Sequence, residues 1–210
     1  MNKDPRSGLL FVVSAPSGAG KTTLVNALLE AENQLVASVS HTTRSRRPQE
    51  HDGVNYHFVS EAEFRDMLDA DEFLEHAVVF GHYYGTAKSA VDEVLAQGRD
   101  VILEIDWQGA EQVRQSYPDC CSIFILPPSR AALRERLHAR GQDSPEVIAK
   151  RTAEAREEMA NHGAFDYIVV NEDFSSALDD LRSIINATRL GRIPKQQELR
   201  SLLADLLADP

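Results

Sequence analysis

Short apolar runs alternate along the chain with longer segments in which apolar residues recur every three or four positions. The apolar runs predict buried strands at 9–13, 101–105, 123–126 and 167–170. The recurring segments predict amphipathic helices at about 21–31, 89–97 and 176–189, and a last, peripheral helix at about 195–208. Buried strands that alternate with helices are typical of an α/β fold in which helices flank a parallel sheet.

Two stretches interrupt this alternation, residues 38–88 and residues 129–162. The first mixes short polar and apolar segments, and Ser60 with Glu63 predicts a capping box at the start of one small helix. The second is strongly charged, and Ser144 followed by a proline is typical of a helix start. We interpret both stretches as insertions on the core, where such segments often act as mobile lids.

Composition places the chain among ordinary globular proteins. It has 210 residues, 42% of them hydrophobic and 26% charged, which excludes a collagen, a disordered tail and a coiled-coil rod. Because 22 Lys and Arg face 33 Asp and Glu, the net charge is −11, and we expect no nucleic-acid partner. No apolar run approaches the roughly 20 residues that cross a bilayer, and the polar start lacks a secretory signal, so we expect no membrane partner.

The two cysteines, Cys120 and Cys121, are adjacent, which is unsuited to an ordinary structural disulfide, and their spacing matches no zinc site. One interpretation is a redox pair. The favoured interpretation is a pair of small apolar side chains at the start of a strand, in a reducing compartment. We therefore expect a cytoplasmic protein.

A phosphate-binding loop of the form G-x-x-x-x-G-K-[ST] follows the first predicted strand, with alanine in place of the first glycine. Its residues are Ala15, Pro16, Ser17, Gly18, Ala19, Gly20, Lys21 and Thr22. Glycines let backbone N–H groups approach phosphate oxygens, and the start of the next helix adds positive potential. The Lys21 ammonium neutralises β- and γ-phosphate charge, and the Thr22 hydroxyl can ligate Mg²⁺. This loop indicates nucleotide binding but does not identify the reaction.

An arginine cluster lies in residues 41–49, where the sequence HTTRSRRPQ holds three arginines and no acidic residue. Guanidinium groups match phosphate oxygens in a bidentate way, so the cluster indicates a second phosphate site. A solvated basic loop is the alternative. Tyr56 can add a hydroxyl donor to that site, although a tyrosine on a strand is more often a packing residue.

Carboxylates occur in two further segments. Glu75 follows an apolar pair in residues 72–86, and Glu104 and Asp106 lie two apart at the end of a predicted strand, on one face. Ligands of open α/β sheets bind at the carboxyl ends of the strands, so the second pair is placed for ligand contact. The alternative for this pair is a solvated strand end.

A basic helical segment follows, because residues 130–151 hold six Lys and Arg against three Asp and Glu. Arg136 and Arg140 are four residues apart and share one helix face, from which they can close over phosphates. A solvated, salt-bridged helix is the alternative.

Taken together, these segments resemble the guanylate kinase family, whose members phosphorylate GMP with ATP. The resemblance covers the chain from about Leu9 to Ile193 and rests on five motifs in order: SAPSGAGKT, SVSHTTRSRRPQEHDGVNYHFV, EFLEHAVVFGHYYGT, LEIDWQG, and RLHARG with the later Lys150-Arg151. It implies a P-loop NTPase-type parallel sheet flanked by helices. The implied core comprises 1–37, 89–128 and 163–210, the GMP-binding insertion 38–88, and the helical lid 129–162.

The resemblance also implies residue roles. The GMP-binding residues would be Ser40, Arg44, Arg47, Tyr56, Glu75, Tyr84, Thr86 and Asp106. The ATP-binding residues would be Ala15, Pro16, Ser17, Gly18, Ala19, Gly20, Lys21, Thr22, Thr23 and Asn171. The catalytic residues would be Lys21, Arg44, Arg136, Arg140 and Arg151, and Thr22 would hold the Mg²⁺ that accompanies ATP. Glu75 and Asp106 would accept hydrogen bonds from guanine, and Thr86 would help at O6.

The implied reaction is ATP + GMP ⇌ ADP + GDP, with dGMP as a further acceptor. A P-loop kinase for another phosphorylated acceptor and a guanylate-kinase-like protein-binding module are the alternatives. The intact phosphate loop argues against the binding module, and Glu75, Thr86 and Asp106 argue against another acceptor. A homo-oligomer is left open.

Overall fold

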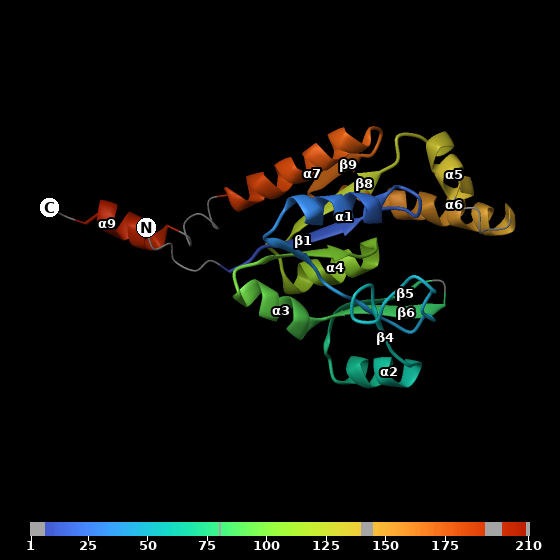
Figure 1. Cartoon of the computed structure of the whole chain (residues 1–210), viewed down its shortest axis with the longest axis horizontal. Helices are drawn as coiled ribbons and strands as arrows, with labels where there is room; N and C mark the ends of the chain where they lie inside the picture. Colours follow the sequence, from blue (N-terminus) through green and yellow to red (C-terminus); the bar gives the residue numbers. More distant parts are fainter. Residues whose placement is uncertain (1–6, 80, 140–144, 192–198, 209–210) are drawn as a thin grey trace.

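The computed structural model describes residues 7–79, 81–139, 145–191 and 199–208. Its central layer is a five-stranded parallel sheet in the order β2-β7-β1-β8-β9 (Figure 1). The strands are β1 (Leu10–Ser14), β2 (Leu35–Ala37), β7 (Asp100–Glu104), β8 (Cys121–Leu126) and β9 (Tyr167–Val170). The strand that precedes the phosphate loop therefore lies in the middle of the sheet. The α/β fold predicted from the apolar runs is confirmed.

Helices cover both faces of this sheet (Figure 1). They are α1 (Lys21–Ala31) and α7 (Phe174–Arg189) on one face, and α3 (Lys88–Ala96) and α4 (Trp107–Ser116) on the other. Each face has its own apolar cluster: Phe11 and Val13 pack with Leu24 and Leu28, whereas Val12 packs on the opposite side. Alternate β1 residues thus serve the two faces, which is why the strand is a continuous apolar run.

The first interrupting stretch forms a second sheet, in the order β4-β3-β6-β5. Its elements are β3 (His41–Thr42), β4 (His57–Phe58), α2 (Glu61–Asp69), β5 (Phe73–Val79) and β6 (His82–Ala87). The predicted capping box is confirmed, since Ser60 and Glu63 exchange side-chain to backbone hydrogen bonds at the start of α2. The sheet itself was not predicted, because two of its strands have only two residues and carry no readable alternation.

The second interrupting stretch holds α5 (Arg130–Ala139), α6 (Pro145–Ala160) and the short 3₁₀ helix η1 (His162–Ala164). A small apolar cluster of Leu133, Leu137 and Ala155 joins α5 to α6. The predicted helix start at Pro145 agrees with α6, while Ser144 lies outside the described residues. Of the predicted last helix, α9 (Arg200–Leu206) is observed, and it lies away from the sheet (Figure 1).

A buried ion cluster fastens the end of the sheet opposite the phosphate loop. Asp100, which is fully buried at the start of β7, accepts hydrogen bonds from the Leu9 N–H at 2.9 Å and from Arg189 Nε at 2.8 Å. Arg189 Nη1 also donates to Glu32 at 2.6 Å. One guanidinium thereby links α7, β7 and the end of α1.

The cysteines fit the favoured interpretation. Cys120 and Cys121 are buried and unbridged, and burial raises the pKa of each thiol to about 11. Such thiols are protonated near neutral pH and are poor nucleophiles, which argues against a redox pair. Among the described helices, none is long and apolar enough to cross a membrane.

Candidate active site

The phosphate loop forms a tight turn between β1 and α1. Gly18 and Gly20 have φ angles of 90° and 92°, a backbone region that side chains with a Cβ rarely adopt. Gly20 precedes the first turn of α1, so the free N–H groups at the helix start face the loop interior. Asp71 is the non-glycine residue with positive φ within the described ranges, so alanine at position 15 carries no backbone strain.

Two predicted ATP-side residues lie against this loop. Asn171 Nδ2 donates to the Ala19 carbonyl at 2.7 Å, and a Cβ at Gly20 would lie only 2.4 Å from that nitrogen. Arg136, from α5, donates to the Ala19 carbonyl at 3.3 Å and to the Asn171 carbonyl at 2.9 Å. The structure thus brings Asn171 and Arg136 to the loop, with the guanidinium on backbone carbonyls.

The carboxyl end of β7 meets the start of α1. Because Val13 of β1 pairs with Glu104 of β7, the Glu104 carboxylate lies beside the phosphate loop, and Thr22 Oγ1 donates to it at 3.1 Å. Lys21 Nζ donates to the Ile105 carbonyl at 3.3 Å. A hydroxyl and a carboxylate are the hard oxygen ligands that Mg²⁺ prefers when nucleotide phosphates and water complete its shell. This donor set fits the predicted Mg²⁺.

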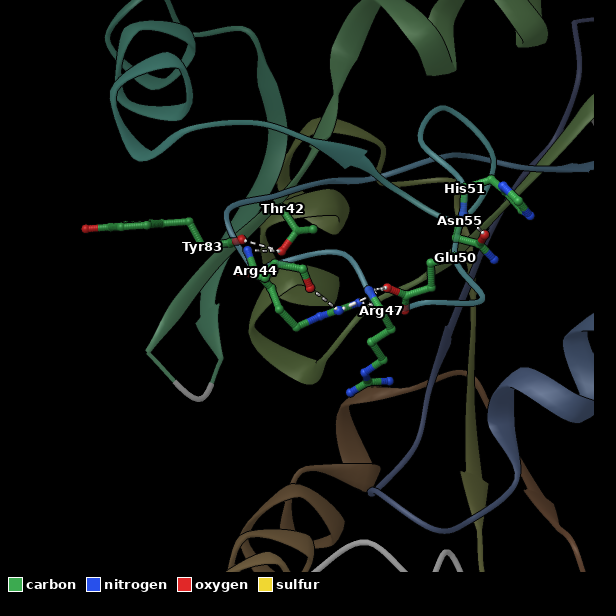
Figure 2. A network of polar contacts seen from close by, with 8 residues as sticks. Thr42, Arg44, Arg47, Glu50, His51, Asn55 and Tyr83 are labelled. Carbon is green, nitrogen blue, oxygen red and sulfur yellow. Dashed lines mark hydrogen bonds and ion pairs between the residues drawn. The ribbon is translucent and has the colours of Figure 1, made fainter.

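The arginine cluster is organised by an acidic residue that the sequence analysis did not single out. Arg44 donates through both terminal nitrogens to Glu50, at 3.0 and 2.8 Å, and to the Ser45 carbonyl at 2.7 Å (Figure 2). Glu50 also accepts from the Arg47 backbone N–H at 2.8 Å. The ion pair raises the pKa of Arg44 and lowers that of Glu50. The sequence signal that points to such a clamp is the first acidic residue after the arginines, three positions beyond Arg47.

Two tyrosines complete this cluster. The Arg44 guanidinium carbon lies 5.4 Å from the ring centroid of Tyr56. Interaction with the Tyr84 side chain, after that with Glu50, also raises the pKa of Arg44. The two rings meet edge to face at 5.9 Å. Burial raises the pKa of Tyr56, so its hydroxyl keeps its proton and remains a donor. Arg47 is exposed, and its side chain extends away from Glu50 (Figure 2).

Glu75 is the buried carboxylate of the site, with 4% of its surface exposed. A register shift between Phe73 and Glu75 interrupts β5, after which Glu75 pairs with Thr86 on β6. Thr86 Oγ1 donates to Glu75 Oε1 at 2.6 Å and lies 3.1 Å from Ser40 Oγ. Burial raises the pKa of Glu75 to about 7, and nearby Asp106 adds to this effect. The Thr86 hydroxyl fixes the position of the Glu75 carboxylate through its hydrogen bond to Oε1.

Asp106 lies at the first turn of α4, where it is the N-cap residue. Its Oδ1 accepts the Gly109 N–H at 2.8 Å. Asp106 influences the pKa of both Glu75 and Glu158, so the three carboxyl groups lie within electrostatic range of one another. Lys21 lowers the pKa of Glu75 and Glu158 and provides the opposing charge.

Glu158, on α6, is a second residue that sequence reasoning missed. Burial raises the pKa of its carboxyl to about 7, while Lys21 and the backbone N–H of Ser17 lower it. A charged helical stretch gave no reason to prefer this acid. Glu158 lies three residues after the buried Ala155, which places it on the inward face of α6 once the helix is packed. Among the predicted lid arginines, Arg151 lies on the same helix, and Arg140 lies outside the described residues.

Known proteins resemble this chain along nearly its whole length. The guanylate kinase family profile matches residues 7–188. A guanylate kinase from Alkalilimnicola ehrlichii is 57% identical over 202 residues, covering 96% of this chain and 98% of its own, and one from Escherichia coli is 54% identical over 204 residues, covering 96% and 99%. The crystal structure of guanylate kinase from Anaplasma phagocytophilum superposes with a TM-score of 0.76 at 33% identity over 96% of both chains. With identity this high along nearly the whole length, the chain belongs to the guanylate kinase family.

Proposed function

We propose that this chain transfers the γ-phosphoryl group of ATP to GMP or dGMP, giving ADP and GDP or dGDP. The observation that carries the proposal is the buried Glu75 carboxylate, which lies within electrostatic range of the phosphate-loop lysine. The phosphate loop, the Arg44 cluster and the buried Glu75 carboxylate together suit a kinase that phosphorylates a purine monophosphate.

Guanine suits the buried Glu75 carboxylate. Its N1–H and exocyclic amino group are donors, and Glu75 and the remaining oxygen of Asp106 can accept hydrogen bonds from them. Adenine instead presents an unprotonated N1, which would meet the ionised form of Glu75 as one acceptor facing another, with no proton between them. Leaving buried polar groups unpaired costs about 1–3 kcal/mol each, and sites built on such pairs reject the wrong ligand strongly.

The phosphate of GMP is already an anionic nucleophile, so the reaction needs no strong general base. Catalysis then consists of positioning the two nucleotides and stabilising charge. In this proposal the GMP phosphate is held by Ser40, Arg44, Arg47, Tyr56 and Tyr84. The loop amides and Lys21 hold the ATP phosphates. When bound, Mg²⁺ supplies charge neutralisation of those phosphates, and Thr22 with Glu104 would hold it.

The lid residues would complete the site on closure. Arg136 and Arg151, with Arg140, would contact the ATP phosphates, and Asn171 would lie near adenine. Arg136 must exchange its backbone carbonyl partners for phosphate oxygens in that step. Closure of 129–162 and of the insertion 38–88 over the core would exclude water and limit ATP hydrolysis.

The cysteines and the net charge support a compartment and a class of partner. The unbridged, buried Cys120 and Cys121 support a reducing cytoplasm, and the net charge of −11 supports small-molecule rather than nucleic-acid partners. Assembly into a homo-oligomer is a prediction that a mass measurement in solution would test.

An ADP-release assay with four acceptor conditions tests the proposal: GMP, dGMP, AMP and no acceptor. We expect rapid ADP release with GMP and dGMP and near-background release with AMP and without acceptor. Equal rates with AMP and GMP would point to another acceptor class. Background rates throughout would favour a protein-binding module.

A further inference from the structure

Gly109, in the first turn of α4, lies directly against the Glu75 carboxylate. A Cβ built on this glycine would lie 2.6 Å from Glu75 Oε2, 3.3 Å from its Cδ and 3.4 Å from Asp106 Oδ1. A distance of 2.6 Å is shorter than any real Cβ contact, so a side chain at position 109 and the present Glu75 position are incompatible.

Gly109 also contacts the second carboxylate, because its N–H donates to Asp106 Oδ1 at 2.8 Å. One residue without a side chain thus gives a hydrogen bond to Asp106 and leaves the space that Glu75 fills. The residue lies between the two groups that accept hydrogen bonds from guanine in the proposed function.

Backbone conformation does not explain the glycine. Gly109 lies inside a helix and its φ is outside the positive range, so alanine is compatible with the backbone. Alanine also has a higher helix propensity than glycine, by up to about 1 kcal/mol in a helix interior. The reason for glycine at this position is therefore the space beside Glu75.

The separation of α4 from β5 is held by a hydrogen-bond clamp one turn further along α4. Gln112 accepts the His76 N–H at 3.0 Å and donates to the His76 carbonyl at 2.8 Å. Since the residue next to Glu75 is fastened in this way, a methyl group at position 109 moves the carboxylate and not the strand. Restoring an ordinary contact of 3.4 Å from 2.6 Å requires a shift of roughly 0.8 Å.

We propose that Gly109 is a positioning residue for guanine selection, which sets where Glu75 and Asp106 present their acceptor oxygens. This inference rests on the proposed function. A displacement of about 1 Å in a positioning group can lower turnover by about 100-fold. Because the atoms nearest to a Cβ at Gly109 belong to Glu75 and Asp106 and not to the phosphate loop, ATP affinity should not change.

The test compares Gly109→Ala with Gly163→Ala, a matched change at a glycine that has nothing within 4 Å of a built Cβ. For both variants we would measure kcat/KM for GMP and for AMP, the Kd of an ATP analogue, and Tm. We expect Gly109→Ala to lower kcat/KM for GMP by about 10- to 100-fold, with unchanged ATP-analogue Kd, unchanged AMP rate and a Tm at or above wild type. Gly163→Ala should match wild type.

A crystal structure of substrate-free Gly109→Ala provides a readout that needs no activity. We expect Glu75 displaced from α4, with α4 and β5 in place. An unmoved Glu75, a GMP efficiency within twofold of wild type, or a lower Tm with parallel losses for GMP and the ATP analogue would each overturn the proposal. Wild-type enzyme that fails to phosphorylate GMP would instead overturn the proposed function, whatever the position of Glu75 in the variant.

Discussion

GMP binding should release a proton from Glu75. In the free protein, burial raises the pKa of this carboxyl to about 7 from its ordinary 4.5, so near neutral pH about half of the molecules carry the proton. Guanine presents two N–H donors to the carboxyl group. In the protonated form of Glu75, the carboxyl O–H would face a guanine N–H, and neither group could accept the hydrogen bond. GMP therefore binds the ionised form, and binding releases the proton.

The magnitude follows from that pKa. If only the ionised form binds, the apparent Kd for GMP is multiplied by about 11 at pH 6, about 2 at pH 7 and about 1.1 at pH 8. Affinity therefore rises with pH and levels off above about pH 8. The difference between pH 6 and the plateau corresponds to about 1.4 kcal/mol of binding free energy. The proton released by Glu75 is about 0.9 per GMP at pH 6 and about 0.5 at pH 7.

Calorimetry in buffers of different ionisation enthalpy measures this proton count. The GMP phosphate also titrates, with a second pKa near 6, so the Glu75→Gln variant serves as the reference. That variant keeps Glu158, whose pKa is also about 7. The difference in protons released per GMP between wild type and Glu75→Gln is therefore the contribution of Glu75. Equal proton counts in both proteins, or GMP affinity that strengthens as pH falls, would refute the reasoning.

Three further outcomes are expected. Lys21→Ala should lower kcat by roughly 100- to 1,000-fold while GMP still binds by calorimetry, because the ammonium serves the transferring phosphates; near-normal turnover would contradict this role. Arg189→Ala should lower the free energy of unfolding by about 3 kcal/mol in urea titrations, since it removes a guanidinium that pairs with the fully buried Asp100, and Arg189→Lys should lose less; a change below about 1 kcal/mol would contradict this role of Arg189. Ser60→Ala should cost about 1 kcal/mol by the same measurement, through loss of the capping box with Glu63, and no loss would mean that α2 is held by packing alone.

Local patterns carried much of the fold and part of the site. Continuous apolar runs predicted four of the five core strands to within two residues, and α1 matched its predicted range, because such signals depend on neighbours one to four positions away. The phosphate loop and the Ser60 cap are equally local. The glycines of the loop and the cap residues of α2 act on the backbone next to them, so both features can be recognised from a short stretch of sequence.

The remainder of the site depends on contacts between segments that are far apart in the sequence. The second sheet, the clamp of Glu50 on Arg44 and the placement of Glu158 all depend on which distant or weakly patterned segments fold back on one another. Gly109 and Glu75 are 34 positions apart, and neither the helix period nor the strand period relates them. The sequence determined which chemical groups were present, whereas the space between α4 and β5 determined how closely two of them approach, because side-chain packing is a property of the assembled core.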